Sequence, residues 1–215
     1  MGDLSNISLF QGLPAEALDA LEQTASTRQY PKNTIIINEG DTSTSLYLLI
    51  AGKVKVFLSD EEGREFVLNS LSPGDYFGEY ALLDDEQRTA SVMTTDTSSF
   101  LIIHKEDFQR LRNDYADMSE ILINNLVGRI RQLTDNVKTL ALKDVYGRIR
   151  KLLGDLSEKS GSDKIEEKLT QQEIANRVGS SREMVARILK DLSVGGYIVS
   201  EKKQITLLKS LPENY

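Results

Sequence analysis

Residues 73–92 read PGDYFGEYALLDDEQRTASV, and this stretch carries the most specific pattern in the chain. Gly78 lets the backbone approach a bound group closely, because glycine has no Cβ. The amides that follow it can face an anion if they begin a helix. Glu79 is a candidate acceptor for a sugar hydroxyl, Arg88 can hold a phosphate, and Thr89 adds a hydroxyl donor. The alternative is a surface arginine paired with the acidic run at 84–86.

The sequence around this stretch predicts a β-rich domain. Residues 14–25 have apolar residues at helical spacing and read as a short helix. Short β-rich runs then follow, separated by turns that contain Gly, Asp or Pro. These runs are 34–38, 45–50, 53–58, 65–71, 90–94 and 99–103. Several short strands at close spacing indicate a β-barrel or a jelly roll.

After Lys105 the apolar period becomes helical. Apolar residues recur at spacings of 3, 4, 3, 4 and 3, which is the pattern of a two-helix seam. They are Ile123, Leu126, Ile130, Leu133, Val137 and Leu140. The alternative is an amphipathic helix that packs on its own domain, but the strict spacing favours a parallel dimer. Asp144 is placed to cap a further helix that runs to about Leu156, and 157–163 reads as a loop.

Residues 169–192, LTQQEIANRVGSSREMVARILKDL, have the organisation of a helix-turn-helix. Thr170 and Glu173 form a capping box for the first helix, Gly179 supplies the turn, and Ser181 caps the second helix. The buried faces are assigned to six apolar residues. They are Ile174, Val178, Val185, Ile188, Leu189 and Leu192.

The second helix of this motif leaves Arg182, Glu183 and Arg187 free to point outward. Arginine can grip guanine through two hydrogen bonds, and glutamate can accept one from cytosine, so these side chains are candidate base contacts. Glu183 and Arg187 are also spaced as a solvated ion pair would be. Gln172, Lys190 and Lys202 are candidate phosphate contacts. A hairpin after Gly195, with its tip at 201–203, makes a winged motif.

The composition excludes several classes of protein. The chain has 215 residues and no Cys, which excludes disulfides and Cys-ligated metal clusters. It shows no apolar run long enough for a membrane helix and no signal-peptide pattern, so we expect a cytoplasmic protein without a membrane partner. The net charge of −7 argues against nucleic acid, but residues 164–209 hold nine basic and six acidic side chains. This asymmetry is what an acidic sensor joined to a DNA-facing module would show.

Together these motifs resemble the family of the cyclic-AMP receptor protein and the fumarate–nitrate regulators, over nearly the whole chain. The resemblance implies an α+β fold with a cyclic-nucleotide-binding jelly roll in 1–115, a dimerisation helix in 116–142 and a winged helix-turn-helix in 143–215. It also implies a cytoplasmic homodimer that binds palindromic double-stranded DNA with TGTGA-like half-sites and works as an activator with RNA polymerase. Cyclic AMP would be its allosteric ligand, with no catalytic cofactor.

Residue by residue, the resemblance gives two sets of contacts. The ligand set comprises Gly78, Glu79, Tyr80, Ala81, Arg88, Thr89 and Thr134. For DNA, the resemblance gives Arg182, Glu183 and Arg187, and the full DNA set also includes Gln172, Ser181 and Lys190. In the cyclic-AMP receptor two adjacent polar residues of the long helix contact adenine, and Leu133 and Thr134 stand at these positions. Because Leu133 cannot hydrogen-bond a base, cyclic GMP, cyclic di-GMP, another effector and ligand-independent action stay open.

The sequence offers little for the rival classes. No nucleophile motif or Walker-type loop is present, so we expect no enzyme and no catalytic residue. His104 is the one histidine, and its place beside Lys105 at the end of a strand fits a surface residue better than a haem ligand. We therefore expect no metal site.

Overall fold

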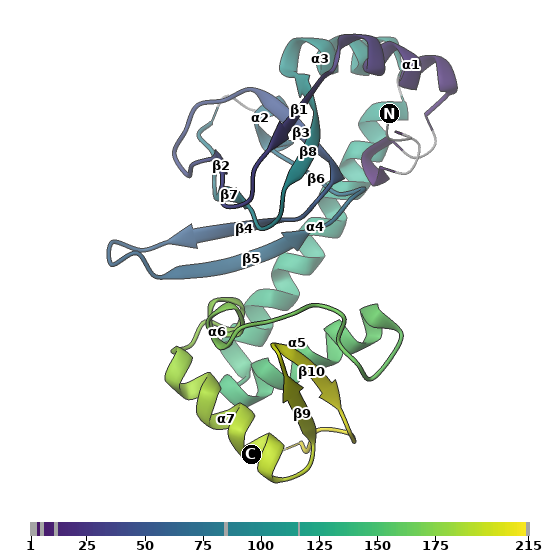
Figure 1. The fold of residues 1–215 in the computed structure, drawn as a ribbon. Helices are drawn as coiled ribbons and strands as arrows, with labels where there is room; N and C mark the ends of the chain where they lie inside the picture. Colours follow the sequence, from purple (N-terminus) through teal and green to yellow (C-terminus); the bar gives the residue numbers. More distant parts are fainter. Residues whose placement is uncertain (1–3, 5–6, 11–12, 84–85, 116, 214–215) are drawn as a thin grey trace. The chain divides into compact units, whose positions relative to one another are not determined.

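A computed structural model describes the whole chain except residues 1–3, 5–6, 11–12, 84–85, 116 and 214–215 (Figure 1). The chain divides into two compact units. The first comprises Met1–Leu58 and Val67–Arg131, and the second comprises Ser59–Phe66 and Gln132–Tyr215.

Two four-stranded sheets lie in the first unit, except that residues 59–66 at one end of the second sheet belong to the second unit. One sheet has the order β1 (Ser26–Tyr30), β8 (Ser98–His104), β3 (Ser45–Ala51) and β6 (Tyr76–Phe77). The other has the order β2 (Ile35–Ile37), β7 (Ser91–Thr94), β4 (Val54–Ser59) and β5 (Glu65–Leu71). All six runs expected to be strands are strands. The sequence did not predict β1 or β6.

The strands β3 and β8 are apolar on both faces because each face meets a different core. Leu48 of β3 and Leu101 of β8 lie in a cluster shared with helices. Leu49 and Phe100, the neighbours of these two residues, point to the opposite face into the cluster that also holds Val54, Leu71 and Val92. This alternation follows from the period of two in a β-strand. The uninterrupted run FLII is therefore a strand buried on both sides.

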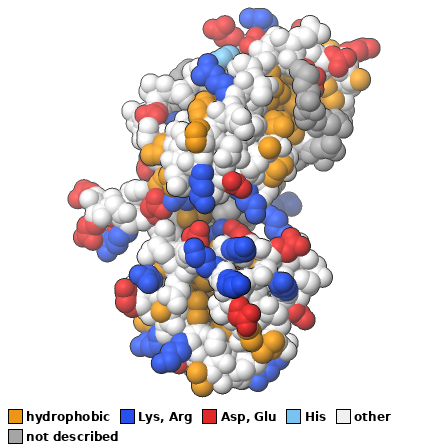
Figure 2. All heavy atoms as spheres, in the orientation of Figure 1, with side chains coloured by type: hydrophobic (Ala, Val, Ile, Leu, Met, Phe, Trp, Pro, Cys, Tyr) orange, Lys and Arg blue, Asp and Glu red, His pale blue; other side chains and the backbone are white. Residues whose placement is uncertain are grey.

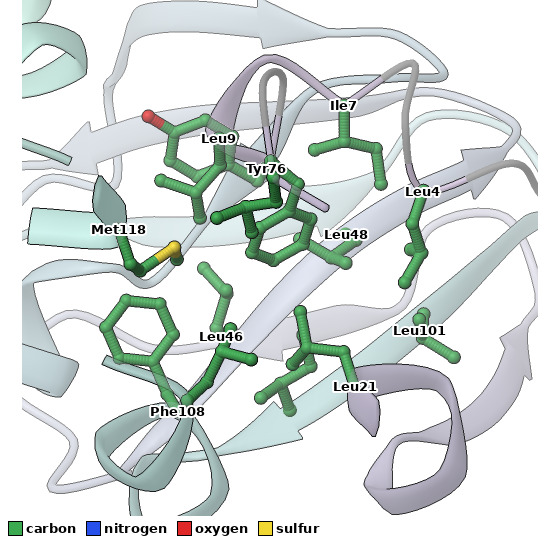
Figure 3. Packing of buried hydrophobic residues seen from close by; sticks show 14 of the residues in the cluster. Leu4, Ile7, Leu9, Leu21, Leu46, Leu48, Tyr76, Leu101, Phe108 and Met118 are labelled. Carbon is green, nitrogen blue, oxygen red and sulfur yellow. The ribbon is translucent and has the colours of Figure 1, made fainter. Parts of the chain in front are cut away.

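The helices of the first unit cover one face of the sheet β1-β8-β3-β6. They are the 3₁₀ turn η2 (Ser8–Phe10), α1 (Ala15–Thr24), α2 (Tyr80–Leu83), α3 (Lys105–Asp114) and the start of α4 (Asp117–Leu142). In Figure 3, Leu46 and Leu101 of the sheet lie in one cluster with Phe108 of α3 and Met118 of α4. Burying a side chain of this size contributes about 1.5–3 kcal/mol. This cluster fixes the N-terminal half of α4 on the sheet.

Helix α4 leaves a row of apolar side chains exposed in the single chain. The row consists of Ile123, Val127, Ile130, Leu133, Val137 and Leu140. The prediction that Leu126 belongs to the seam is wrong, because this residue packs against the core of the first unit. Val127 takes its place in the exposed row, and the spacings become 4, 3, 3, 4 and 3. The row still forms one face, since residues three and four apart are neighbours on a helix.

The second unit packs three helices and a hairpin around one apolar core. The elements are α5 (Val145–Ser160), α6 (Gln171–Val178), α7 (Arg182–Val194), β9 (Ile198–Glu201) and β10 (Gln204–Leu207). Asp144 caps α5 as predicted, with its Oδ1 accepting from the Gly147 N–H at 2.8 Å. The predicted end near Leu156 is wrong by one turn. The helix continues to Ser160, and Gly161 after it takes the left-handed conformation (φ 62°) that ends many helices.

The hairpin turns at Lys202 and Lys203, and the predicted tip at 201–203 therefore includes the last residue of β9. Both lysines have positive φ, 48° and 70°. A two-residue turn of this type matches the twist of its strands but strains residues that carry a Cβ.

Candidate functional site

The stretch 73–92 folds into strand β6, a sharp bend at Gly78, the short helix α2 and an extended segment that carries Arg88. Gly78 has a φ of +88°, which side-chain-bearing residues rarely adopt. A Cβ there would lie 2.7 Å from Nη1 of Arg88 and 2.8 Å from the carbonyl oxygen of Ser45. The glycine is therefore required both by its backbone conformation and by the close approach of Arg88.

Arg88 is buried, with 7% of its surface exposed, and its guanidinium is held by three neighbouring groups. Nη1 donates to the carbonyl of Gly78 at 2.9 Å, and Nη2 donates to the carbonyl of Ser45 at 2.7 Å. Ser43 Oγ accepts from both Nε and Nη2, at 2.9 and 2.5 Å. Burial lowers the pKa of Arg88, and the electrostatic influence of Tyr47, Glu79 and Asp41 opposes this effect. Arg88 is therefore buried and is not a surface arginine, and Asp84 and Asp85, two of its alternative partners, lie outside the described residues.

Glu79 is the second buried charged residue of this stretch, with 1% of its surface exposed. Its Oε1 lies 2.7 Å from Nη1 of Arg129, which reaches it from helix α4. This ion pair lacks the geometry of a directed hydrogen bond, and among the described residues Oε1 has no hydrogen-bond partner. Burial raises the pKa of Glu79, and Arg129 acts in the opposite direction. The site thus holds a buried acceptor that a ligand hydroxyl can satisfy.

Arg129 is fixed by two further contacts with strand β6. Its Nη2 donates to the carbonyl of Tyr76 at 2.8 Å, and its guanidinium carbon lies 4.8 Å from the centre of the Tyr76 ring. Burial raises the pKa of Tyr76 to about 12. The arrangement ties α4 to the strand that leads into Gly78.

The structure brings Gly78, Glu79 and Arg88 together as the sequence predicted. Tyr80 begins α2 and is exposed, and Thr89 is exposed beside Arg88. The backbone of Ala81 belongs to α2. Thr134 lies on α4 in the second compact unit.

Sequence reasoning did not assign Ser43 or Arg129 to this site. Ser43 is separated from Arg88 by 45 residues and lies in a loop without a recognisable motif. Arg129 had a usable signal. It follows Leu122 and Leu126 at spacings of seven and three, and both leucines pack on the core of the first unit. Arg129 therefore lies on the face of α4 that meets this unit.

The helix-turn-helix has the predicted local chemistry. Thr170 Oγ1 accepts from the Glu173 N–H at 3.1 Å, and a Glu173 carboxylate oxygen accepts from the Thr170 N–H at 2.6 Å. Ser181 Oγ accepts from the Met184 N–H at 3.2 Å and caps α7. Gly179 between the helices has a φ of +63°. All six apolar residues expected to be buried in these helices are buried.

The candidate DNA contacts are exposed and lie on α6, on α7 or directly before α7. Arg182 and Glu183 occupy the first turn of α7, where a helix that enters the major groove meets the bases. Arg187 lies one turn further on and contacts the sulfur of Met184. Gln172 donates to Asn176 on α6, and Lys190 lies in the second half of α7. Figure 2 shows that acidic and basic side chains are interspersed on the visible face of the second unit.

The part of the chain that the structure describes contains no group of three or more His, Asp or Glu residues able to hold a metal ion. None of its helices is both long and apolar enough to cross a membrane. His104 ends strand β8, and its Nδ1 lies 3.1 Å from Ser45 Oγ.

Comparison with known proteins agrees with this division of the chain. Residues 27–115 match the family described as the cyclic nucleotide-binding domain. Residues 147–210 match the Crp-like helix-turn-helix domain. The class defined by fold and site is thus a cyclic-nucleotide-binding domain joined to a DNA-binding helix-turn-helix.

Whole-length relatives make the assignment specific. The "CRP-like cAMP-activated global transcriptional regulator" of Mycobacterium tuberculosis is 32% identical over 212 residues, which is 96% of this chain and 95% of that protein. The "cAMP-activated global transcriptional regulator CRP" of Escherichia coli O157:H7 is 33% identical over 83% of this chain and 88% of that protein. The chain belongs to the CRP/FNR family of transcription regulators.

Solved structures agree with this family. The c-di-GMP-responsive regulator CLP of Xanthomonas campestris has a TM-score of 0.82 and is 27% identical, with 91% of this chain and 100% of that chain covered. The catabolite activator protein of Thermus thermophilus has a TM-score of 0.58 and is 28% identical, with 94% of each chain covered.

Proposed function

We propose that this regulator is controlled by cyclic AMP bound at Arg88 and Glu79. The observation that carries the proposal is the buried Glu79 Oε1, which has no hydrogen-bond partner among the described residues and stands one residue from the glycine that contacts Arg88. The ribose 2′-hydroxyl would donate to Glu79, and the cyclic phosphate would bind Arg88 and Thr89. Gly78, Tyr80 and Ala81 would line the approach, and Thr134 would contact the base. The cAMP-activated relatives support this ligand.

The proposed active form is a homodimer that assembles through the exposed apolar row of α4. A row that extends from Ile123 to Leu140 on one helix is what a parallel two-helix seam requires. The corresponding domains would be 1–115 for the nucleotide, 116–142 for dimerisation and 143–215 for DNA. A twofold dimer implies a palindromic operator, and we propose TGTGA-like half-sites spaced by about 34 Å.

In the proposed DNA complex, Arg182, Glu183 and Arg187 read bases. Gln172 and Lys190 contact phosphates, and Ser181 supports the first turn of α7 while facing the DNA backbone. The regulator would act in the cytoplasm, as an activator that contacts RNA polymerase, without catalysing a reaction itself.

Calorimetric titration with cyclic AMP, cyclic GMP and cyclic di-GMP in parallel tests the ligand. We expect cyclic AMP to bind most tightly and Arg88→Leu to abolish binding. The matched control is Arg110→Leu, because Arg110 is an exposed arginine on α3 in the same unit and pairs with Asp107. Unchanged affinity in Arg88→Leu would remove Arg88 from the site.

Fluorescence anisotropy with a palindromic TGTGA duplex tests the response. Cyclic AMP must bind the DNA-competent state more tightly than the other state if it is to control DNA binding. Equal DNA affinity with and without cyclic AMP would contradict the proposal that cyclic AMP controls DNA binding. Arg182→Ala is expected to cost about 1–3 kcal/mol and to relax specificity at one base pair, whereas Arg110→Ala leaves DNA binding unchanged.

Cyclic di-GMP is the second candidate ligand. Leu133 is 45% exposed and offers no hydrogen bond to a base, and the CLP relative is described as c-di-GMP responsive. The parallel titration separates the two, because tight binding of cyclic di-GMP without binding of cyclic AMP would favour this second ligand.

A further inference from the structure

The loop that leads into strand β3 is held to the backbone of Arg88 by two hydrogen bonds. The Gly40 N–H donates to the Arg88 carbonyl at 2.8 Å, and the Arg88 N–H donates to the Asp41 carbonyl at 2.9 Å. The Asp41 carboxylate accepts from the backbone and side-chain nitrogens of Asn38, both at 3.1 Å. Ser43 lies in this loop, half-buried, and its position relative to Arg88 is therefore set by the backbone.

A guanidinium can hold a phosphate by two parallel hydrogen bonds from either of two edges, and here both edges are occupied. The edge formed by Nη1 and Nη2 donates to the backbone carbonyls of Gly78 and Ser45. The edge formed by Nε and Nη2 donates to the hydroxyl of Ser43. Backbone carbonyls within a strand or a constrained bend cannot turn away, whereas a serine hydroxyl moves by rotation about one bond. The edge facing Ser43 is thus the one that a ligand can take over.

The hydroxyl of Ser43 also has the right donor capacity. A serine oxygen accepts up to two hydrogen bonds and donates one. In this structure Ser43 Oγ accepts two from Arg88, so its own proton remains available as a donor. An anion that displaces Ser43 from the guanidinium edge would find the same hydroxyl beside it.

We propose that Ser43 is a ligand-binding residue that exchanges roles, accepting from Arg88 without ligand and donating to one exocyclic phosphate oxygen of the bound cyclic nucleotide. This inference rests on the proposed function, in which Arg88 binds the cyclic phosphate. It adds a contact from a loop far from the stretch 73–92 in sequence. It also assigns the phosphate to the Nε–Nη2 edge of Arg88.

Calorimetry with cyclic AMP on the full-length protein provides the first test. Ser43→Ala is expected to weaken binding about tenfold, the effect of losing one hydrogen bond to a charged group. Ser43→Thr keeps the hydroxyl and is expected to restore binding. Ser91→Ala is the matched control, because Ser91 Oγ accepts from the Glu39 N–H in the same unit. It is expected to bind like the wild type.

The two phosphorothioate diastereomers of cyclic AMP distinguish a direct contact from support of Arg88. Each diastereomer carries sulfur, a weak acceptor, in place of a different exocyclic oxygen. Ser43→Ala is expected to weaken binding of one diastereomer about tenfold. For the other diastereomer, which has already lost the hydrogen bond, the change stays within about twofold.

Three results have distinct meanings. If Ser43→Ala binds cyclic AMP as tightly as the wild type while Arg88→Leu does not bind it, the role of Ser43 is overturned and the proposed function stays intact. Equal losses for both diastereomers also overturn it, because Ser43 would then act only through Arg88. Wild-type protein that binds no cyclic nucleotide overturns the proposed function and this inference with it.

Discussion

Replacing Gly78 by alanine tests whether the bend before α2 is built around Arg88. Gly78 has a φ of +88°, and an added Cβ would meet Nη1 of Arg88 at 2.7 Å and the Ser45 carbonyl oxygen at 2.8 Å. Contacts below 3.0 Å force something to move. Since the Ser45 oxygen belongs to the backbone of β3, we expect Arg88 to be displaced and its bond to the Gly78 carbonyl to be lost.

The magnitude follows from three contributions. Positive φ at a residue with a Cβ costs about 1–2 kcal/mol, and the reduced freedom of the unfolded chain returns about 0.4–1 kcal/mol. Loss of a hydrogen bond from a charged donor adds about 1.5–3 kcal/mol. We therefore expect Gly78→Ala to lower the free energy of unfolding by about 2–4 kcal/mol.

Gly63→Ala is the matched control, because Gly63 has a φ of +74° and nothing within 4 Å of an added Cβ. It isolates the backbone cost, about 1 kcal/mol. The assay is urea unfolding followed by circular dichroism at one protein concentration, with cyclic AMP titration of the folded variants. Equal destabilisation in the two variants, with normal nucleotide binding by Gly78→Ala, would refute the argument.

Three further predictions concern other parts of the chain. Thr170→Ala removes one half of a complete capping box and should lower the unfolding free energy by about 1 kcal/mol, measured by urea denaturation. Ile130 is 62% exposed in the apolar row of α4, so Ile130→Asp should shift the protein from dimer to monomer in analytical ultracentrifugation, whereas the exposed Arg110→Asp should not. The pKa of Tyr76 is raised to about 12, so the folded state holds this proton more tightly and stability should fall as pH rises from about 10 towards 12. Tyr76→Phe should remove that part of the decline, and an unchanged alkaline profile would contradict the assignment.

The sequence predicted elements best where the pattern and the physical cause coincide. The capping box of α6, the cap of α7 and the left-handed Gly179 are local features, fixed by residues within a few positions of one another. The central strands β3 and β8 were predictable from their apolar runs, because both of their faces are buried. The cluster of Gly78, Glu79 and Arg88 was also predictable, since it lies within one short stretch.

The features that were missed depend on distant contacts. Strand β1 is polar and largely exposed at a sheet edge, and it is a strand because it pairs with β8 from Ser26 to Tyr30. Strand β6 has two residues, too few to show a period. Ser43 acquires its place only when the loop closes on Arg88. Leu126 and Val127 are adjacent and both apolar, so their spacing alone did not decide which of them packs on the core.

The contact between Glu79 and Arg129 sets a condition on any ligand control. Arg129 belongs to α4, the helix that also carries the exposed apolar row. A ligand hydroxyl that binds Glu79 therefore acts on the residue that is ion-paired to this helix. Complete switching between two states needs a difference in ligand binding of about 5.5 kcal/mol. One hydrogen bond to a charged group supplies about 1.5–3 kcal/mol. A ligand that bonded Glu79 alone would therefore shift the equilibrium only partly. Full control requires the phosphate contacts at Arg88 to differ between the two states as well.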